Sequence, residues 1–162
     1  MIDITLAKHE DMYEVADLVI GAFGTETCVK IPALGDPKTA SKMMFIERYL
    51  DFINKKNPYM CYIARKDGEL IGAVAGYTFV YQWAPQIWGS EDFWYVKKEY
   101  RGGSTGVKLF NKLMNWFDEL KVDKICMMHY SWNEKVGDFY EKNGFYNYET
   151  SYVKDMKGWY MA

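Results

Sequence analysis

The first part of the chain changes from alternating hydrophobic and polar residues to hydrophobic residues at helical spacing. Residues 2–6 alternate with a period of two, which predicts a strand with one buried face. Residues 12–23 carry hydrophobic side chains three and four positions apart, as one face of a helix does. Gly24 is placed to end this helix, so we expect a loop from residue 24 to residue 35.

The same patterns predict a second helix and three further strands in the middle of the chain. Asp36 and Pro37 are typical of a helix start, because Asp caps free N–H groups and Pro needs no N–H at the first position. Hydrophobic residues then recur with helical spacing as far as residue 53. The predicted strands cover residues 60–64, 70–81 and 93–96, after which the pattern changes again.

The last third of the chain repeats the change from strand to helix. Residues 107–117 have the spacing of an amphipathic helix, and residues 123–130 favour a strand buried on both faces. A short helix that ends at Gly144 follows, and residues 145–156 favour one bent strand or a short hairpin. The predicted order of elements is therefore β-α-α-β-β-β-α-β-α-β.

Composition and charge narrow the class of protein. With 162 residues, of which 49% are hydrophobic, the chain can bury one core, and we predict a single domain over residues 1–162. A net charge of -2 supplies no broad basic surface, so nucleic acid is not an expected partner. The three cysteines are widely spaced, which suits buried free thiols better than disulfides or a metal site. The sequence opens without a leader pattern or a long apolar run, so we expect a cytoplasmic protein with no membrane partner.

A glycine-rich turn between a predicted strand and helix is the strongest candidate for a binding site. It consists of Arg101, Gly102, Gly103, Ser104, Thr105 and Gly106. Small residues let successive backbone N–H groups converge at the positive end of the helix dipole, where phosphate binds. The spacing excludes a P-loop, and the position past the middle of the chain disfavours a dinucleotide fingerprint. An ordinary β-to-α turn is the alternative.

Two segments resemble motifs of the GNAT superfamily of N-acetyltransferases. Arg101 and Gly106 match the ends of the family's pyrophosphate loop, Gln/Arg-x-x-Gly-x-Gly/Ala, while Ser104 stands where the first glycine is usual. Residues 133–145, NEKVGDFYEKNGF, resemble the family's Asn-x-x-Ala-x-x-Phe-Tyr-Glu-Lys-x-Gly-Phe segment, with Val136 in place of Ala. The order of elements also resembles the GNAT fold, an α/β arrangement in which helices flank a mixed sheet.

The resemblance implies a protein that takes acetyl-CoA as cosubstrate and needs no metal. Backbone groups of Trp94, Tyr95 and Val96 would bind the pantetheine arm, residues 101–106 would face the pyrophosphate, and Asn133 would lie near the pantetheine. Acetyl would pass directly to a primary amine of a small molecule or protein. No covalent enzyme intermediate is then required.

The same resemblance suggests Tyr140 as the general acid that protonates the CoA thiolate. A phenol is suited to this role, because its ordinary pKa of about 10 keeps it protonated at neutral pH yet lies near a thiol's ~8.5. The alternative is a core aromatic, since Tyr140 shares a helical face with Val136 and Phe139. Replacing Tyr140 by Phe should then slow catalysis while leaving CoA affinity and melting temperature nearly unchanged.

For the general base, strand alternation favours Asp92, which should share a face with Trp94 and Val96. Glu91 and a chain of water molecules are the alternatives, and a solvated carboxylate at a strand end is an equally simple interpretation of Asp92. His129 could also reach this site, although a single His near a strand end is more often packed or exposed.

Other function classes stay open at this level. A non-catalytic domain that binds CoA or a partner protein, or an acyltransferase with a larger acyl group, would carry the same motifs. We expect residues 25–36 and 82–88 to form the acceptor wall, whose ligand the sequence does not identify. The family's final hairpin is abbreviated here, so a homodimer through that element is undecided. Residues 101–106 together with 149–154 also resemble small phage-encoded GNAT proteins.

Overall fold

A mixed sheet forms the centre of the molecule. The computed structural model describes all residues except 32–33, 35–40, 55–57 and 155–162. Within these limits, five strands form one sheet in the order β1-β2-β3-β4-β5, antiparallel except for the parallel pair β4 and β5. Their bounds are Ile2–Leu6, Tyr59–Lys66, Glu69–Val80, Ile87–Val96 and Lys124–Cys126.

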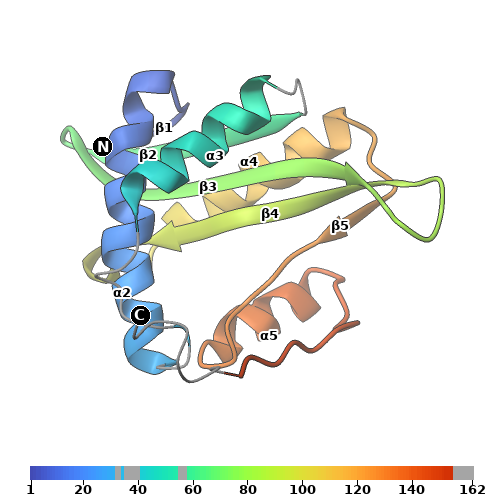
Figure 1. The fold of residues 1–162 in the computed structure, drawn as a ribbon. Helices are drawn as coiled ribbons and strands as arrows, with labels where there is room; N and C mark the ends of the chain where they lie inside the picture. The colour runs from blue at the N-terminus through green and yellow to red at the C-terminus, as the bar shows by residue number, and fades with distance from the viewer. Residues whose placement is uncertain (32–33, 35–40, 55–57, 155–162) are drawn as a thin grey trace, which may run out of the picture.

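Helices cover both faces of this sheet (Figure 1). A continuous helical run consists of η1 (His9–Asp11), α1 (Met12–Ala16), the π-helix η2 (Asp17–Phe23) and α2 (Gly24–Lys30). The remaining helices are α3 (Lys42–Asn54), η5 (Lys98–Tyr100), α4 (Thr105–Glu119) and α5 (Glu134–Lys142). None of the helices within the described ranges is long and apolar enough to cross a membrane.

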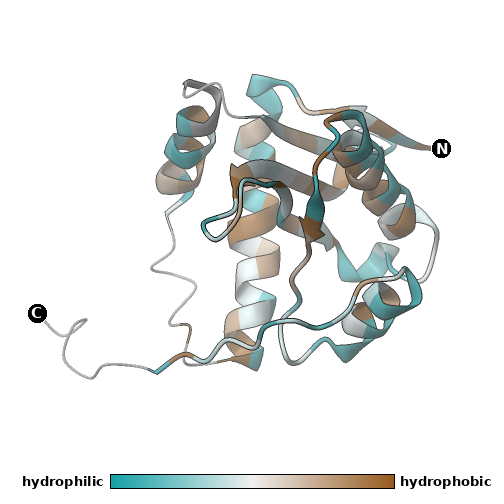
Figure 2. Ribbon diagram, turned by 90° about the vertical axis from the view of Figure 1, so that its right-hand side faces the viewer, coloured by the Kyte–Doolittle hydropathy of each residue, from teal (hydrophilic) through white to brown (hydrophobic). Residues whose placement is uncertain are grey.

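Two hydrophobic cores hold the layers together. On one face, Met12 and Val15 of α1 pack with Phe93 of β4, and the core also includes Leu18, Cys61, Ile63, Leu70, Ala73, Ala75 and Tyr95. On the other face, α4 packs its apolar stripe on the sheet through Leu109, Leu113 and Phe117, joined by Met60, Ala64, Ile71, Val74 and Val96. Figure 2 shows hydrophobic residues along the central strands and in bands on the helices. The predicted class, a mixed sheet flanked by helices, is confirmed.

The first helical run is longer than the sequence predicts. Gly24 was expected to end it, but its φ of -58° and ψ of -46° are helical, and the chain continues as α2 to Lys30. The predicted loop over residues 24–35 is therefore wrong as far as Lys30. The helix start predicted at Asp36 and Pro37 lies outside the described residues, and α3 begins at Lys42.

The C-terminal part carries less strand than expected. The strand predicted over residues 123–130 is limited to Lys124–Cys126, because the chain leaves β4 after Cys126 and loses its pairing partner. Residues 145–154, the described part of the expected final strand, form no strand, and Tyr146 and Tyr148 are exposed there. The short helix ends as predicted, with Gly144 at a φ of 86°.

Candidate functional site

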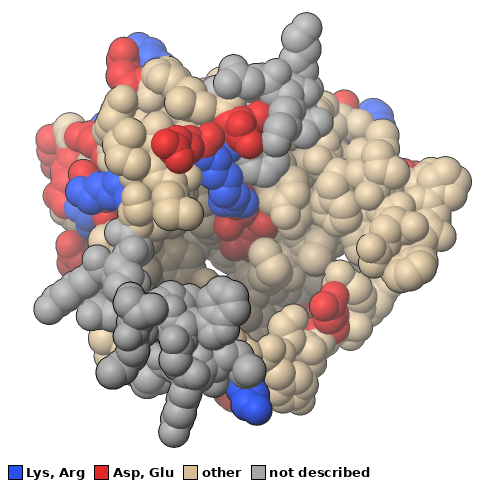
Figure 3. All heavy atoms as spheres, in the orientation of Figure 1, with Lys and Arg blue, Asp and Glu red and all other residues tan. Residues whose placement is uncertain are grey.

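The candidate site lies where β4 separates from β5. The two strands pair over Trp88–Ser90 and Lys124–Cys126, and within the described chain β4 continues to Val96 with a strand partner on its β3 side alone. Figure 1 shows the chain after β5 diverging from β4 toward α5, and Figure 3 shows this face hollowed near its centre. The backbone edge left open in this gap is suited to hydrogen bonds with a ligand arm that carries amide groups.

A β-bulge in β4 decides which carboxylate faces the gap. The register with β3 shifts between Ala75 and Gly76 and leaves Asp92 as the extra residue. Because a bulge breaks the alternation of a strand, Asp92 does not share a face with Trp94 and Val96, and this prediction is wrong. Trp94 and Val96 pack on the α4 side, whereas Asp92 contacts residues on the opposite side of the sheet.

Two partners hold Asp92 against α3. Its carboxylate forms an ion pair with Arg48 of α3 and accepts a hydrogen bond from the Tyr59 hydroxyl at 3.0 Å. The Asp92 side chain is 5% exposed, and burial raises the pKa of Tyr59 far above its ordinary value. The contacts of Asp92 therefore connect α3 to the sheet.

Glu91, which sequence analysis named as an alternative base, lies buried in the gap beside α5. The hydroxyl of Tyr140 lies 3.0 Å from Glu91 Oε2 and 3.1 Å from the carbonyl oxygen of Met128, and it can donate to either. Burial raises the pKa of Glu91 to about 7, although hydrogen bonds with Tyr140 and the Met128 backbone oppose this rise. This carboxyl group therefore changes its charge near neutral pH.

Tyr140 is also buried, and its pKa is raised as well. Burial, and after it the neighbouring Glu91 charge, raises the pKa of Tyr140 far above its ordinary value, so the phenol stays protonated at neutral pH. The ordinary phenol pKa of about 10, on which the sequence-based role of Tyr140 rests, therefore does not apply to this buried side chain. Two hydrogen-bonded groups whose pKa values lie far apart are a feature of acid–base pairs in active sites.

The glycine-rich turn is open where a phosphate would lie. Gly102 has a φ of 89°, and a Cβ added to Gly102 or Gly103 would meet nothing within 4 Å. Ser104 is the N-cap of α4 without a side-chain cap bond, so the helix keeps the free N–H groups of its first turn. The indole of Trp94 donates to the carbonyl oxygen of Gly106 at 3.2 Å and thereby joins β4 to the turn. These residues fit the diphosphate of CoA, which backbone N–H groups at a helix start would bind.

The side chain of Arg101 is held by contacts with α2 and β4. Its guanidinium donates to both carboxylate oxygens of Glu26 at 2.9 and 2.7 Å, and its Nε donates to the carbonyl oxygen of Val96 at 2.8 Å. It also lies over the ring of Tyr95, 5.1 Å from the centroid. That residues 101–106 face the pyrophosphate stays a prediction, and within it the Arg101 side chain already has partners in the protein. The distant Glu26 gave no local sequence signal.

The remaining candidates flank the gap. Asn133 is the N-cap of α5, and its backbone N–H donates to the carbonyl oxygen of Tyr130 at 2.8 Å. His129 is exposed, and its ring centroid lies 6.3 Å from that of Tyr140. Among the described residues, no group of three or more His, Cys, Asp or Glu could hold a metal ion.

With this geometry in hand, comparison with known proteins identifies the family. The model of the acetyltransferase (GNAT) family matches residues 29–145, which include the open gap, the glycine-rich turn and α5. The chain belongs to the GNAT acetyltransferase family. No curated protein matches the chain significantly.

Solved GNAT structures share this fold over nearly the whole chain. A predicted acetyltransferase from Clostridium acetobutylicum, solved with acetyl-CoA, is 15% identical with a TM-score of 0.73, over 95% of this chain and 96% of that one. A ribosomal-protein-alanine N-acetyltransferase from Brucella melitensis is 23% identical with a TM-score of 0.67, over 96% and 99%. A glucosamine-6-phosphate N-acetyltransferase from Arabidopsis thaliana is 16% identical with a TM-score of 0.68, over 95% and 97%.

Proposed function

We propose that this GNAT protein is an acetyl-CoA-dependent N-acetyltransferase that acts on a primary amine of a small molecule or protein. The observation that carries this proposal is the buried pair of Glu91 and Tyr140 at the point where β4 separates from β5. A carboxyl group with a pKa of about 7 is poised to accept a proton at neutral pH. The GNAT structure solved with acetyl-CoA supports the choice of acyl donor.

The two side chains divide the proton transfers between them. Acetyl-CoA supplies the thioester, and the open edge of β4 with residues 101–106 would hold it. Glu91 accepts the proton that the amine nitrogen must lose. Once Glu91 is neutral, the contribution of its charge to the raised pKa of Tyr140 disappears, and the phenol becomes a better donor.

The proton balance then closes within this pair. Tyr140 donates its hydroxyl proton to the departing sulfur and receives the proton that Glu91 took from the amine, across their 3.0 Å contact. Glu91 returns to its carboxylate form, and the net result is one proton moved from nitrogen to sulfur. Neither residue forms a covalent bond to the acyl group.

The test measures amine-dependent release of free thiol from acetyl-CoA, with mass spectrometry of the product to detect one added acetyl group. Suitable acceptors are spermidine, tyramine, glucosamine 6-phosphate and a peptide with a free N-terminal alanine. We expect at least one of these amines to be acetylated. CoA binding without amine-dependent release would instead favour a non-catalytic domain. Faster release from succinyl-CoA or a longer acyl-CoA would favour a larger acyl donor.

Two neighbouring substitutions identify the base. We expect Glu91→Gln to lower kcat/KM by about 100-fold or more, within the usual range for general bases. Asp92→Asn is the matched control, because it neutralises the adjacent carboxylate on the opposite side of the sheet. A larger loss with Asp92→Asn would assign the base to Asp92, and a small loss with both would leave water as the proton acceptor.

A further inference from the structure

Glu26, Tyr95 and Arg101 form a cluster that joins α2 to the turn before α4. The two hydrogen bonds from Arg101 to Glu26 are parallel, one to each carboxylate oxygen, at 2.9 and 2.7 Å. The Tyr95 hydroxyl donates a third hydrogen bond to Oε2 of Glu26 at 3.0 Å. Only 11% of the Glu26 side chain is exposed. Bidentate pairs of this kind fix orientation as well as charge.

The Arg101 side chain is held in this cluster by its hydrogen bonds and by the negative charge of Glu26. The hydrogen bonds from Arg101 are the main reason why the pKa of Glu26 is lowered, so the carboxylate stays ionised at neutral pH. The same guanidinium donates to Val96 and stacks over Tyr95. Its positive charge is thus largely balanced before any ligand arrives, and the anion site depends chiefly on backbone N–H groups of the turn.

Those N–H groups bind well only if the turn is held in one conformation. Gly102 and Gly103 have no packing neighbours at a Cβ position, and Ser104 lacks a side-chain cap bond. Glycine loses much conformational freedom when it is ordered, so a turn of this composition needs an external anchor. Arg101 is the first residue of the turn, and Glu26 is the residue that fixes its side chain.

Tyr95 has a second contact, with Phe23 of η2, the helical segment directly before α2. The ring of Phe23 stacks on Tyr95 at 4.9 Å and meets Tyr130 edge to face at 5.7 Å. Tyr95 lies on β4, whereas Tyr130 lies beyond β5, so Phe23 bridges the two sides of the gap. The helical segment from Phe23 to Glu26 therefore contacts both the gap and the turn.

We propose that Glu26 is a positioning residue for the CoA diphosphate. It fixes Arg101 and thereby orders the turn that binds the diphosphate, without touching the ligand itself. This inference rests on the proposed function, because it assumes that CoA occupies the turn. It goes further by assigning part of the CoA site to α2, where the sequence predicts a loop that forms the acceptor wall.

The decisive experiment compares Glu26→Gln with the wild type. Calorimetric titration with CoA should show a Kd raised about tenfold, while kcat at saturating acetyl-CoA stays within about twofold. S-acetylpantetheine, which lacks the diphosphate, should be used with equal kcat/KM by both proteins. In an Arg101→Gln background, adding Glu26→Gln should cause no further loss, because both residues act through one contact.

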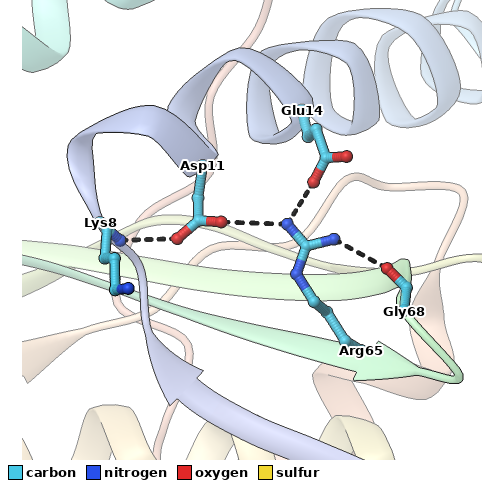
Figure 4. A network of polar contacts seen from close by, with 5 residues as sticks. All are labelled: Lys8, Asp11, Glu14, Arg65 and Gly68. Carbon is cyan, nitrogen blue, oxygen red and sulfur yellow. Dashed lines mark hydrogen bonds and ion pairs between the residues drawn. The ribbon is translucent and has the colours of Figure 1, made fainter.

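The ion pair between Arg65 and Glu14, which includes no residue of the turn, supplies a matched control (Figure 4). Arg65 also binds Asp11 at 3.0 Å, so Glu14→Gln removes one carboxylate from an arginine cluster of similar kind. We expect this variant to bind CoA with the wild-type Kd. An unchanged CoA Kd in Glu26→Gln would overturn the positioning role, and so would a lower Kd, which would mean that Glu26 competes with the diphosphate for Arg101. In either case the wild type would still bind CoA, so the proposed function would stand.

Discussion

At the scale of single residues, the burial of Glu91 has a cost that depends on pH. The folded pKa of about 7 is higher than the unfolded value of about 4.5, so the folded protein binds more protons between these two values. Stability therefore falls as pH rises from about 4.5 through 7, and the full cost of the buried charge remains above that range.

Glu91→Gln should remove this cost. We expect the variant to be more stable than the wild type at pH 8, by at most about 3 kcal/mol, since one pKa unit corresponds to 1.36 kcal/mol. The gain should shrink steadily as the pH is lowered toward 5. Urea unfolding of both proteins at pH 5 and pH 8 measures it. The same difference at both pH values would contradict the raised pKa of Glu91.

Tyr140→Phe separates the chemical role of the hydroxyl from the packing of its ring. The change keeps the ring contacts with Trp94 and Phe145, so we expect an unchanged CoA Kd and a kcat lower by roughly 10- to 1,000-fold. The buried hydroxyl contacts Glu91 and Met128, and leaving those oxygens without it should cost about 1–3 kcal/mol. The melting temperature should thus fall, contrary to the expectation from sequence. Turnover close to wild type, with the chemical step rate-limiting, would assign Tyr140 to the core alone.

At the scale of elements, two substitutions in the turn before α4 separate the effect of an added side chain from the effect of an added negative charge. A Cβ at Gly106 would lie 3.6 Å from the indole of Trp94, an ordinary contact, so Gly106→Ala should fold normally. Gly106→Glu adds a negative side chain at the helix start, where the dipole favours anions and where CoA would place its diphosphate. We expect the CoA Kd to change less than about threefold for Ala and to rise more than about 100-fold for Glu. Equal Kd values in two folded variants would place the diphosphate elsewhere.

The sequence predicts these elements well where the signal is local. The turn at residues 101–106 and the helix after it follow from glycine spacing and a helical period, and both are present. Which residue of β4 becomes the extra one, Asp92, depends on the register with β3, where Leu113 packs closely against Gly76. The continuation of the helix through Gly24 brings Glu26 to Tyr95 of β4 and to Arg101, which are distant in sequence.

The side chains of the candidate site also differ in whether a local sequence pattern predicts them. The motif at residues 133–145 predicts Tyr140 as a candidate acid, and Glu91 is a candidate base as the neighbour of Asp92. The pairing of Arg101 with Glu26 joins residues far apart in sequence, and a single sequence carries no sign of it. Local patterns thus locate the site, whereas the partner and direction of each side chain depend on the tertiary structure.

At the scale of the whole molecule, the sheet fixes the relative positions of the turn, the open edge of β4 and α5. The turn is attached to β4 through Trp94 and to α2 through Glu26, while Tyr140 brings α5 against the same strand. A ligand that spans from the turn to Glu91 would contact elements from both halves of the chain. Its binding should therefore stabilise the fold as a unit.

This leads to a test that needs no acceptor. A ligand that binds only the folded state stabilises it by RT ln(1 + [L]/Kd), which is about 2.7 kcal/mol at a concentration of 100 Kd. For a domain of this size, each kcal/mol raises the melting temperature by roughly 2–4 °C, so saturating CoA should raise it by roughly 5–10 °C. The shift should grow with the logarithm of CoA concentration and should nearly vanish in Gly106→Glu. Adenosine, which lacks the diphosphate and the pantetheine arm, is the negative control. A melting temperature that does not respond to CoA would contradict the assignment of this fold's gap and turn as a CoA site.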